Sequence, residues 1–394
     1  MEHKTRIKGN VHYVGVNDRN KHRFEGMWPL PYGVSYNSYL IDDEMVALVD
    51  TVDICYFEVY LRKIKQVIGE RPINYLIINH MEPDHSGSIR LIKQHYPEII
   101  IVGNKQTFGM IEGFYGVTGE QYLVKEGDFL ALGHHKLRFY MTPMVHWPET
   151  MMTFDETDGV LFSGDGFGCF GTVDGGFLDT RINVDKYWGE MVRYYSNIVG
   201  KYGSPVQKAL QKLGGLPISA ICSTHGPVWT ENIAKVIGIY DRLSRYDADE
   251  GVVIAYGSMY GNTEQMAEAI AEELSAQGVK NIVMHNVTKS HPSYIIADIF
   301  RYKGLIIGSP TYSNQIFPEV EALLSKILLR EVKGRYLGYF GSFTWAGAAV
   351  KRLAEFAEKS KFELVGDPVE MKQAMKDLTY TPVSYTHLRA HETD

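Results

Sequence analysis

The chain has 394 residues, of which 45% are hydrophobic and 22% are charged, and these values are near those of folded globular proteins. The formal net charge of -7 excludes nucleic acid as the main partner, because phosphate binding requires a concentrated basic face. The N-terminal residues lack an apolar signal core, and no apolar run is long enough to cross a membrane. The sequence therefore predicts a cytoplasmic protein, and its length favours two or three domains, of which we expect two.

The first predicted elements are strands in pairs. The β-prone segments 33–40 and 45–49 flank a polar turn and predict a hairpin. Further along, helices are predicted at 56–69, 86–95, 105–112, 184–198 and 204–213, and strands at 129–141 and 150–163. This order predicts two sheets wrapped by helices.

A cluster of metal-binding side chains follows the apolar strand predicted at 73–78. The run from Asn79 to His85 contains His80, Glu82, Asp84 and His85. Residues two apart on an extended chain share a face, so the first three can converge while His85 turns inward. One short loop can thereby serve two metals.

Three further candidate ligands, His146, Asp165 and His225, each follow a later predicted strand. The whole set can hold two ions if one carboxylate, for which we favour Asp165, bridges them. Mixed imidazole and carboxylate ligands suit iron, manganese or zinc. Glu82 favours iron, because zinc hydrolases of similar layout usually have a second histidine at that place.

The polar tract 245–251 interrupts the pattern just before a new buried strand, so we expect domains at 1–248 and 249–394. Beyond it, strands predicted at 252–256, 281–286, 303–308 and 336–341 alternate with helices at 263–276, 291–299, 318–329 and 347–359. This alternation predicts a doubly wound parallel sheet. Residues 383–394 lack periodicity where a closing helix is due, so we expect that helix to be missing or replaced after about 382, through a truncated or foreign end.

The loop 257–263 joins a strand to a helix and predicts a phosphate site made of backbone N–H groups and the helix N-terminus. It lacks the Gly-Lys-Ser/Thr ending of a triphosphate loop, which favours a monophosphate. Segments 309–314 and 342–347 end later strands at the same sheet edge, and their aromatic residues can cover a planar ring. The arrangement looks like the FMN site of flavodoxin. The predicted cofactor-binding residues are Ser258, Met259, Tyr260, Gly261, Asn262, Thr263, Pro310, Thr311, Tyr312, Asn314, Ser342, Phe343, Thr344, Trp345 and Gly347.

With both sites in place, nearly the whole chain resembles the flavodiiron proteins, also called A-type flavoproteins. In that family a metallo-β-lactamase-like αββα sandwich precedes a flavodoxin-like domain. The family motif His-x-Glu-x-Asp-His, followed by single His, Asp and His ligands at long intervals, is matched at every position. The resemblance implies a catalytic non-haem di-iron centre. One iron would take His80, Glu82 and His146, and the other Asp84, His85 and His225, with Asp165 as the bridge.

The resemblance also implies an oxidoreductase that passes electrons from FMN to iron and reduces dioxygen to water, nitric oxide to nitrous oxide, or both. It implies a head-to-tail homodimer or a dimer of dimers, with Trp147 and Trp345 at the junction, although packing is an equally good role for Trp147. Three isolated cysteines cannot form a fused rubredoxin, so the electron donor would be a separate rubredoxin, a flavin reductase or a deazaflavin.

Two alternatives compete with this interpretation. A binuclear zinc hydrolase of the same lactamase-like fold, acting on a thioester or phosphodiester, would keep the flavodoxin-like domain as an accessory. A non-catalytic FMN electron carrier would leave the predicted metal ligands without a role.

Overall fold

A computed structural model describes residues 5–376, which form two compact units. The first unit runs to Tyr195 and includes Tyr202–Ser244, and the second contains Ser196–Lys201 and the chain from Arg245 onward. The predicted domain boundary, after residue 248, falls just beyond Ser244.

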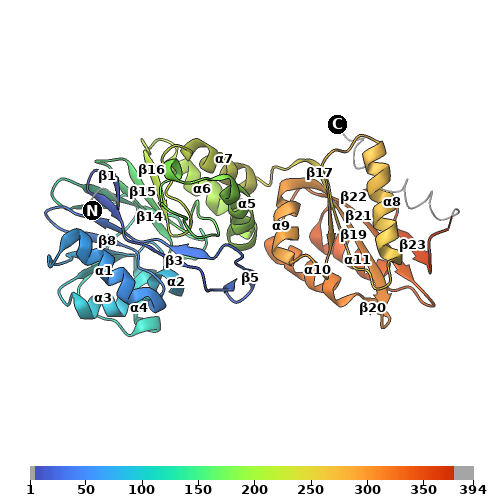
Figure 1. Ribbon diagram of the computed structural model, residues 1–394, viewed down its shortest axis with the longest axis horizontal. Coiled ribbons are helices and arrows are strands. Elements are labelled where there is room, and N and C mark those ends of the chain that lie inside the picture. Colours follow the sequence, from blue (N-terminus) through green and yellow to red (C-terminus); the bar gives the residue numbers. More distant parts are fainter. Residues whose placement is uncertain (1–4, 377–394) are drawn as a thin grey trace. The chain divides into compact units, whose positions relative to one another are not determined.

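Two larger sheets stack face to face in the first unit (Figure 1). The first has the order β1 (Arg6–Lys8), β2 (Val11–Tyr13), β7 (Tyr39–Ile41), β8 (Ala47–Val49), β9 (Tyr75–Ile77), β10 (Ile100–Gly103), β11 (Gln121–Leu123). The second has the order β12 (Phe129–Ala131), β13 (Lys136–Met141), β14 (Met151–Asp155), β15 (Val160–Gly164), β16 (Ala220–Ser223). Two short ribbons pair β3 (Val16–Asp18) with β6 (Val34–Tyr36) and β4 (Arg23–Phe24) with β5 (Trp28–Pro29). The apolar side chains between the larger sheets form one core cluster, which accounts for the sandwich.

Helices cover the outer faces of this sandwich (Figure 1). They are α1 (Phe57–Ile68), α3 (Ile89–His95), α4 (Lys105–Tyr115), α5 (Asp185–Tyr194), α6 (Gly203–Leu213) and α7 (Ile233–Ser244). The short helix α2 (Pro83–Ser86) instead has Asp84, His85 and Ser86 buried. In α1 the buried residues Phe57, Tyr60, Ile64 and Ile68 recur every three or four positions, so one stripe faces the sheet. The predicted αββα sandwich is confirmed.

The predicted hairpin is confirmed in β7 and β8, where Leu40 lies opposite Leu48. The single strand predicted at 33–40 is wrong, because it divides into β6 and β7. Between them the chain bends at Asn37 and Ser38, whose buried side chains donate hydrogen bonds to Ser223 O at 2.9 Å and Val49 O at 3.1 Å. The helix predicted at 86–95 corresponds to α3, which begins later, at Ile89. The segments 129–141 and 150–163, which were predicted as strand regions, each contain two strands joined by a turn.

Parallel strands form the sheet of the second unit, in the order β18 (Ile282–Asn286), β17 (Asp249–Tyr256), β19 (Tyr302–Tyr312), β21 (Tyr336–Phe343), β22 (Glu363–Leu364). β20 (Gln315–Ile316) pairs antiparallel with β19, and β23 (Val369–Lys372) pairs parallel with β21. The helices are α8 (Asn262–Ala276), α9 (Pro292–Arg301), α10 (Pro318–Arg330) and α11 (Ala349–Ser360). The predicted doubly wound alternation is confirmed. The irregular tail predicted at 383–394 lies outside the described residues.

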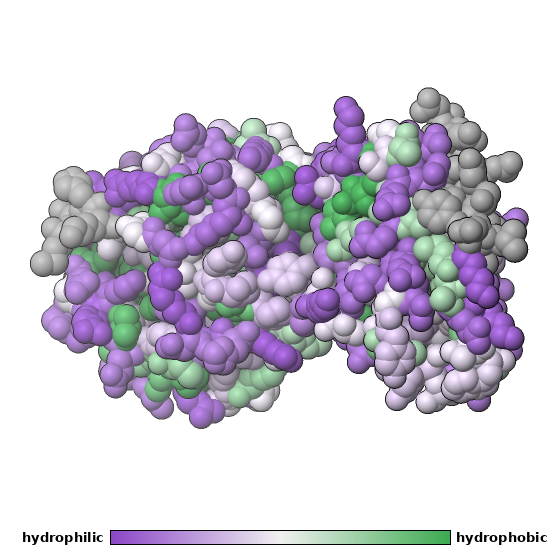
Figure 2. All heavy atoms as spheres, turned by 45° about the vertical axis from the view of Figure 1, so that its right-hand side comes forward, coloured by the Kyte–Doolittle hydropathy of each residue, from purple (hydrophilic) through white to green (hydrophobic). Residues whose placement is uncertain are grey.

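Hydrophilic residues predominate on the molecular face shown in Figure 2. Among the described residues, no helix combines the length and the apolar character needed to cross a bilayer.

Candidate metal centre and flavin cleft

The loop after β9 carries four of the predicted ligands into the interior. His80 lies in the loop, Glu82 directly precedes α2, and Asp84 and His85 lie within α2. All four side chains are buried. The buried carboxylate of Asp50 fixes the start of this loop, because it accepts the Asn79 backbone N–H at 2.8 Å and the Asn79 amide at 3.1 Å.

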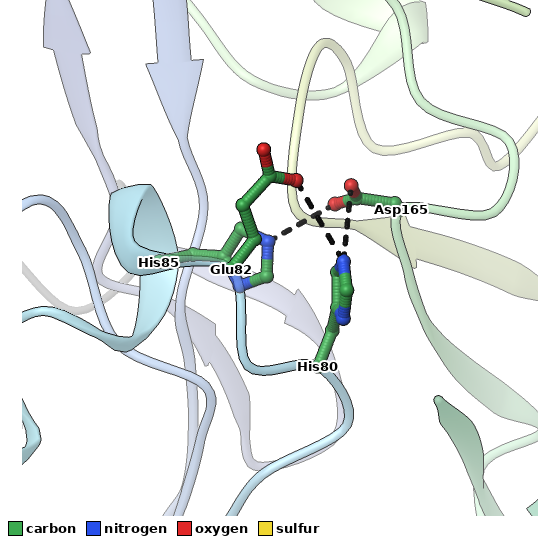
Figure 3. Close-up of side chains that lie close together, drawn as sticks. All are labelled: His80, Glu82, His85 and Asp165. Carbon is green, nitrogen blue, oxygen red and sulfur yellow. Dashed lines mark ion pairs between the residues drawn. The ribbon is translucent and has the colours of Figure 1, made fainter. Parts of the chain in front are cut away.

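The remaining predicted ligands lie in loops that follow strands of the second sheet. His146 lies between β13 and β14, Asp165 directly follows β15, and His225 follows β16. All three are buried, and Figure 3 shows how Asp165 meets His80 and His85 in one nest. The structure thus brings all seven predicted ligands together from four separate segments of the chain. We call this cluster the metal nest.

Asp165 lies at the middle of the nest and presents one oxygen to each half. Its Oδ2 lies 3.0 Å from Nε2 of His146 and 3.6 Å from Nε2 of His80. Its Oδ1 lies 3.2 Å from Nε2 of His85 and 3.5 Å from Nε2 of His225. This arrangement suits a carboxylate that bridges two cations.

Each half has a further carboxylate. Glu82 Oε2 lies 3.1 Å from Nε2 of His146, on the Oδ2 side of the bridge. Asp84 lies 3.4 Å from Nε2 of His225 and 3.6 Å from Nε2 of His85, on the Oδ1 side. The two halves therefore offer the same chemistry, which is two imidazoles and one carboxylate beside the shared Asp165.

Hydrogen bonds fix the tautomers of two histidines. Nδ1 of His80 lies 2.7 Å from Oε1 of Glu149, which also accepts the Met81 backbone N–H at 2.9 Å. Nδ1 of His225 lies 2.8 Å from the Ser35 carbonyl oxygen. Because both partners are acceptors, each ring donates from Nδ1, and Nε2 is left directed at the nest, where a cation can replace any proton on it.

Burial and charge oppose each other in the nest. Burial raises the pKa of Glu82, but the imidazoles of His146 and His80 together outweigh it and lower that pKa to about 2. Burial lowers the pKa of His85, but the carboxylates of Asp84 and Asp165 outweigh it and raise that pKa to about 10. The carboxylates thus hold protons on neighbouring imidazoles, and metal cations can replace those protons.

The polar atoms of the nest fit a metal pair. Within the part of the chain that the structure describes, both oxygens of Asp84, both ring nitrogens of His85 and Nε2 of His225 are buried without a hydrogen-bond partner. Leaving such groups unsatisfied is costly, and coordination to cations would satisfy them. No thiolate contributes to the set, and its nitrogen and oxygen donors suit iron, manganese or zinc.

A cavity of about 540 Å³ opens onto the nest at Glu82 and Asp84. Its wall combines aromatic and charged side chains, among them Phe24, Phe114 and Lys21. The nest itself is buried, so this cavity provides a route for a small substrate.

A second cavity, of about 420 Å³, lies at the carboxyl ends of the strands of the second unit. Thirteen of the fifteen predicted cofactor-binding residues line it, and Gly261 and Gly347 do not. The cavity also includes Ser313, Ala346 and Gln373, which were not among the predicted residues. Gln373 follows β23, and a lone glutamine so far from the three loops gives no signal in the sequence.

The start of α8 fits a phosphate group. Gly261, with φ of 92°, precedes the helix and supplies no side chain, so no side-chain hydrogen bond caps the first-turn N–H groups of α8. The hydroxyls of Thr263 and Ser342 lie 2.9 Å apart beside this turn. Trp345 and Tyr312 are 83% and 47% exposed at the rim, so both rings remain free to cover a planar ligand.

Four residues that support the predicted ligands were not predicted from the sequence, namely Asp50, Glu149, Ser35 and Thr224. The hydroxyl of Thr224 donates a short hydrogen bond to Asp165. Of the four, Glu149 had a weak signal, because it lies three residues after His146 in the same loop. Trp147 packs its ring edge-on to His80, with ring centroids 5.3 Å apart.

Comparisons with known proteins agree with this architecture. Residues 34–226 match the ODP family beta lactamase, and residues 254–381 match the flavodoxin family. An anaerobic nitric oxide reductase flavorubredoxin of Vibrio vulnificus is 32% identical over 363 residues, which cover 91% of this chain and 73% of that protein. The rubredoxin oxygen:oxidoreductase of Desulfovibrio gigas superposes with a TM-score of 0.92 at 31% identity, over 97% of this chain and 96% of that one. A flavodiiron protein from Giardia intestinalis gives a TM-score of 0.91 at 28% identity, over 97% and 95% of the two chains.

The fold and the two sites define an oxidoreductase with a di-metal site in a lactamase-like domain and an FMN cleft in a flavodoxin-like domain. The chain belongs to the flavodiiron protein family.

Proposed function

We propose that this protein reduces dioxygen to water, nitric oxide to nitrous oxide, or both, at a pair of iron ions that receive electrons from FMN. The observation that best supports the proposal is the position of the Asp165 carboxylate. Its two oxygens face two equivalent sets of imidazole and carboxylate side chains. The names of the relatives add support, because they include a nitric oxide reductase and an oxygen oxidoreductase.

In this proposal the seven clustered residues are the metal ligands. His80, Glu82 and His146 would hold one iron, Asp84, His85 and His225 would hold the other, and Asp165 would be shared by both. FMN bound in the cleft would supply one-electron and two-electron redox chemistry, and iron held by these residues would supply the electrons that reduce the diatomic gas. The protein positions these groups through the tautomers of His80 and His225 and through Asp50, which fixes the ligand loop.

The FMN cleft serves the same reaction. The first turn of α8 would bind the phosphate, and Tyr312 and Trp345 would cover the isoalloxazine ring. We assign the two functions to domains at 1–248 and 249–394. Because the two sites belong to different domains, we propose a head-to-tail homodimer, alone or paired into a tetramer, in which the FMN of one subunit faces the metal cavity of the other. The name of the Desulfovibrio gigas relative supports a separate rubredoxin as the electron donor.

Metal and flavin analysis of the purified protein, followed by gas addition to the anaerobically reduced protein, tests the proposal. We expect two iron ions and one FMN per chain, and rapid reoxidation by dioxygen or nitric oxide. Two zinc ions with hydrolysis of a thioester or phosphodiester, and no iron, would instead support the binuclear zinc hydrolase. Iron-loaded protein that reacts with neither gas would contradict the reductase assignment.

A further inference from the structure

The two halves of the metal nest have equal ligand sets but unequal surroundings. Each half offers two imidazoles and one carboxylate beside Asp165, so the ligands alone do not distinguish two bound irons. Behind His225, the acceptor is the neutral backbone carbonyl of Ser35 at 2.8 Å. Behind His80, it is the carboxylate of Glu149 at 2.7 Å.

Several contacts fix Glu149 in position for its hydrogen bond with His80. The residue is fully buried, and its Oε1 accepts hydrogen bonds from both the His80 ring and the Met81 backbone N–H. Its backbone oxygen accepts the Asn104 amide at 2.6 Å, which fixes the loop that carries it. The ring of Trp147 packs edge-on to His80 and restricts movement of the imidazole. The carboxylate and the ring are therefore fixed against each other.

A role in stability alone does not account for a carboxylate at this position. Within the described residues, Oε2 of Glu149 is buried and has no hydrogen-bond partner. A buried unsatisfied carboxylate oxygen costs folding free energy, and a neutral glutamine could accept the same two bonds without burying a charge. The negative charge itself is what distinguishes glutamate here.

We propose that Glu149 is a positioning residue that makes the two irons unequal: it strengthens Nε2 of His80 as a donor and stabilises the ferric state at that iron. A carboxylate acceptor on the remote ring nitrogen raises the basicity of a ligating histidine, whereas a neutral carbonyl does so less. The iron next to His80 therefore has the lower reduction potential, and the half-reduced pair keeps its ferric charge there. This inference rests on the proposed di-iron function.

The variant Glu149→Gln tests the proposal, because the amide oxygen can still accept from His80 while the charge is lost. Redox titration of the iron-loaded protein, followed by electron paramagnetic resonance of the half-reduced pair, measures the separation of the two one-electron steps. We expect the potentials of the two one-electron steps to move closer to each other and the signal of the half-reduced pair to fall several-fold. Iron affinity at one position should fall by about 10-fold or more.

Two further variants test whether altering any buried carboxylate–histidine pair would change the separation of the two steps. Asp155→Asn neutralises another fully buried carboxylate, which bonds Nδ1 of His135 at 2.9 Å at the other end of β14, and should leave both steps unchanged. Glu149→Asp keeps the charge, so it should retain more of the separation than Glu149→Gln does, even if the latter folds poorly.

The proposal is overturned if Glu149→Gln keeps both irons and the wild-type separation, if Glu149→Asp loses as much separation as Glu149→Gln, or if Asp155→Asn has the same effect. Failure of the proposed function is recognised separately, because the wild-type protein would then bind no iron pair or show no reoxidation by either gas.

Discussion

The two units build their sites in opposite ways. The metal nest collects seven side chains from positions 80–225, all buried, and residues outside the set, such as Glu149 and Ser35, fix two of its imidazoles. The flavin cleft consists mainly of three short loops at one sheet edge, and its two large aromatic residues at the rim are exposed. A nest of this kind can control charge and ligand geometry, whereas an open cleft can bind a cofactor and leave its edge accessible for electron transfer.

The largest effect expected from this contrast is complete loss of one function without the other. His146→Ala removes an imidazole that lies 3.0 Å from Asp165 and 3.1 Å from Glu82. Gas-dependent turnover should fall by more than about 100-fold, which exceeds the loss typical of a residue behind a ligand. The flavin absorption spectrum should remain, because the cleft belongs to the other unit. Retained turnover would remove His146 from the set of ligands.

The two sites should also differ in their response to pH. The pKa of His85 is about 10 instead of the ordinary 6.5, so its ring carries a proton at neutral pH that a metal must displace. Metal affinity of chelator-treated protein should therefore rise as the pH rises, by about tenfold per pH unit for each proton displaced. Titrations in buffers of different ionisation enthalpy measure this proton release. Binding without proton release would show that His85 is not a ligand.

The stability of chelator-treated protein should follow the same charges. The raised pKa of His85 gives a contribution that is complete below 6.5 and is lost as the pH rises through about 10. The lowered pKa of Glu82 gives a second contribution to folding stability, which is complete above pH 4.5 and is lost as the pH falls through about 2. Unfolding midpoints across this range should be highest between these limits, and a midpoint that rises steadily up to about pH 10 would contradict the His85 contribution.

A smaller effect is expected in the flavin cleft. Trp345→Ala removes an exposed ring at the rim, and the lost stacking of about 0.5–1.5 kcal/mol corresponds to roughly 2-fold to 10-fold weaker FMN binding. Leu329→Ala provides a matched control, because Leu329 is 62% exposed on α10 and lies outside the cavity. Fluorescence titration with FMN compares the two variants. Equal affinities for both variants would refute the stacking role of Trp345.

The contrast also explains what could be predicted from the sequence. The flavin loops are local, since each follows a strand whose apolar run is evident, and the parallel order brings them to one edge. The seven residues predicted as ligands were recognisable from spacing and family resemblance, and the structure brings them together in one nest. The supporting residues were not recognisable in this way. Asp50 and Glu149 lie in other loops and contact the loop after β9 only in the folded chain. No spacing rule connects a carboxylate to a histidine 69 positions away.

The smallest expected effect on function concerns a second cluster of His and Asp side chains, whose members form hydrogen bonds with one another and with the backbone. His135, Asp155 and Asp158 lie close enough to hold an ion, yet Asp155 accepts from His135 at 2.9 Å and from the Thr157 N–H at 3.1 Å. Asp155→Asn should leave metal content and turnover unchanged and lower the free energy of unfolding by about 1–3 kcal/mol. The pKa of His135 is raised mainly by its hydrogen bond to Asp155, against the effect of burial, so the lost stabilisation is complete below 6.5 and declines as the pH rises through the folded value. Denaturant unfolding at about pH 6 and about pH 8 should therefore show the larger loss at the lower pH. Loss of a metal ion from this variant would instead show that two kinds of metal site exist in the first unit, and that buried carboxylate and imidazole groups gather there for ligation even when they satisfy one another.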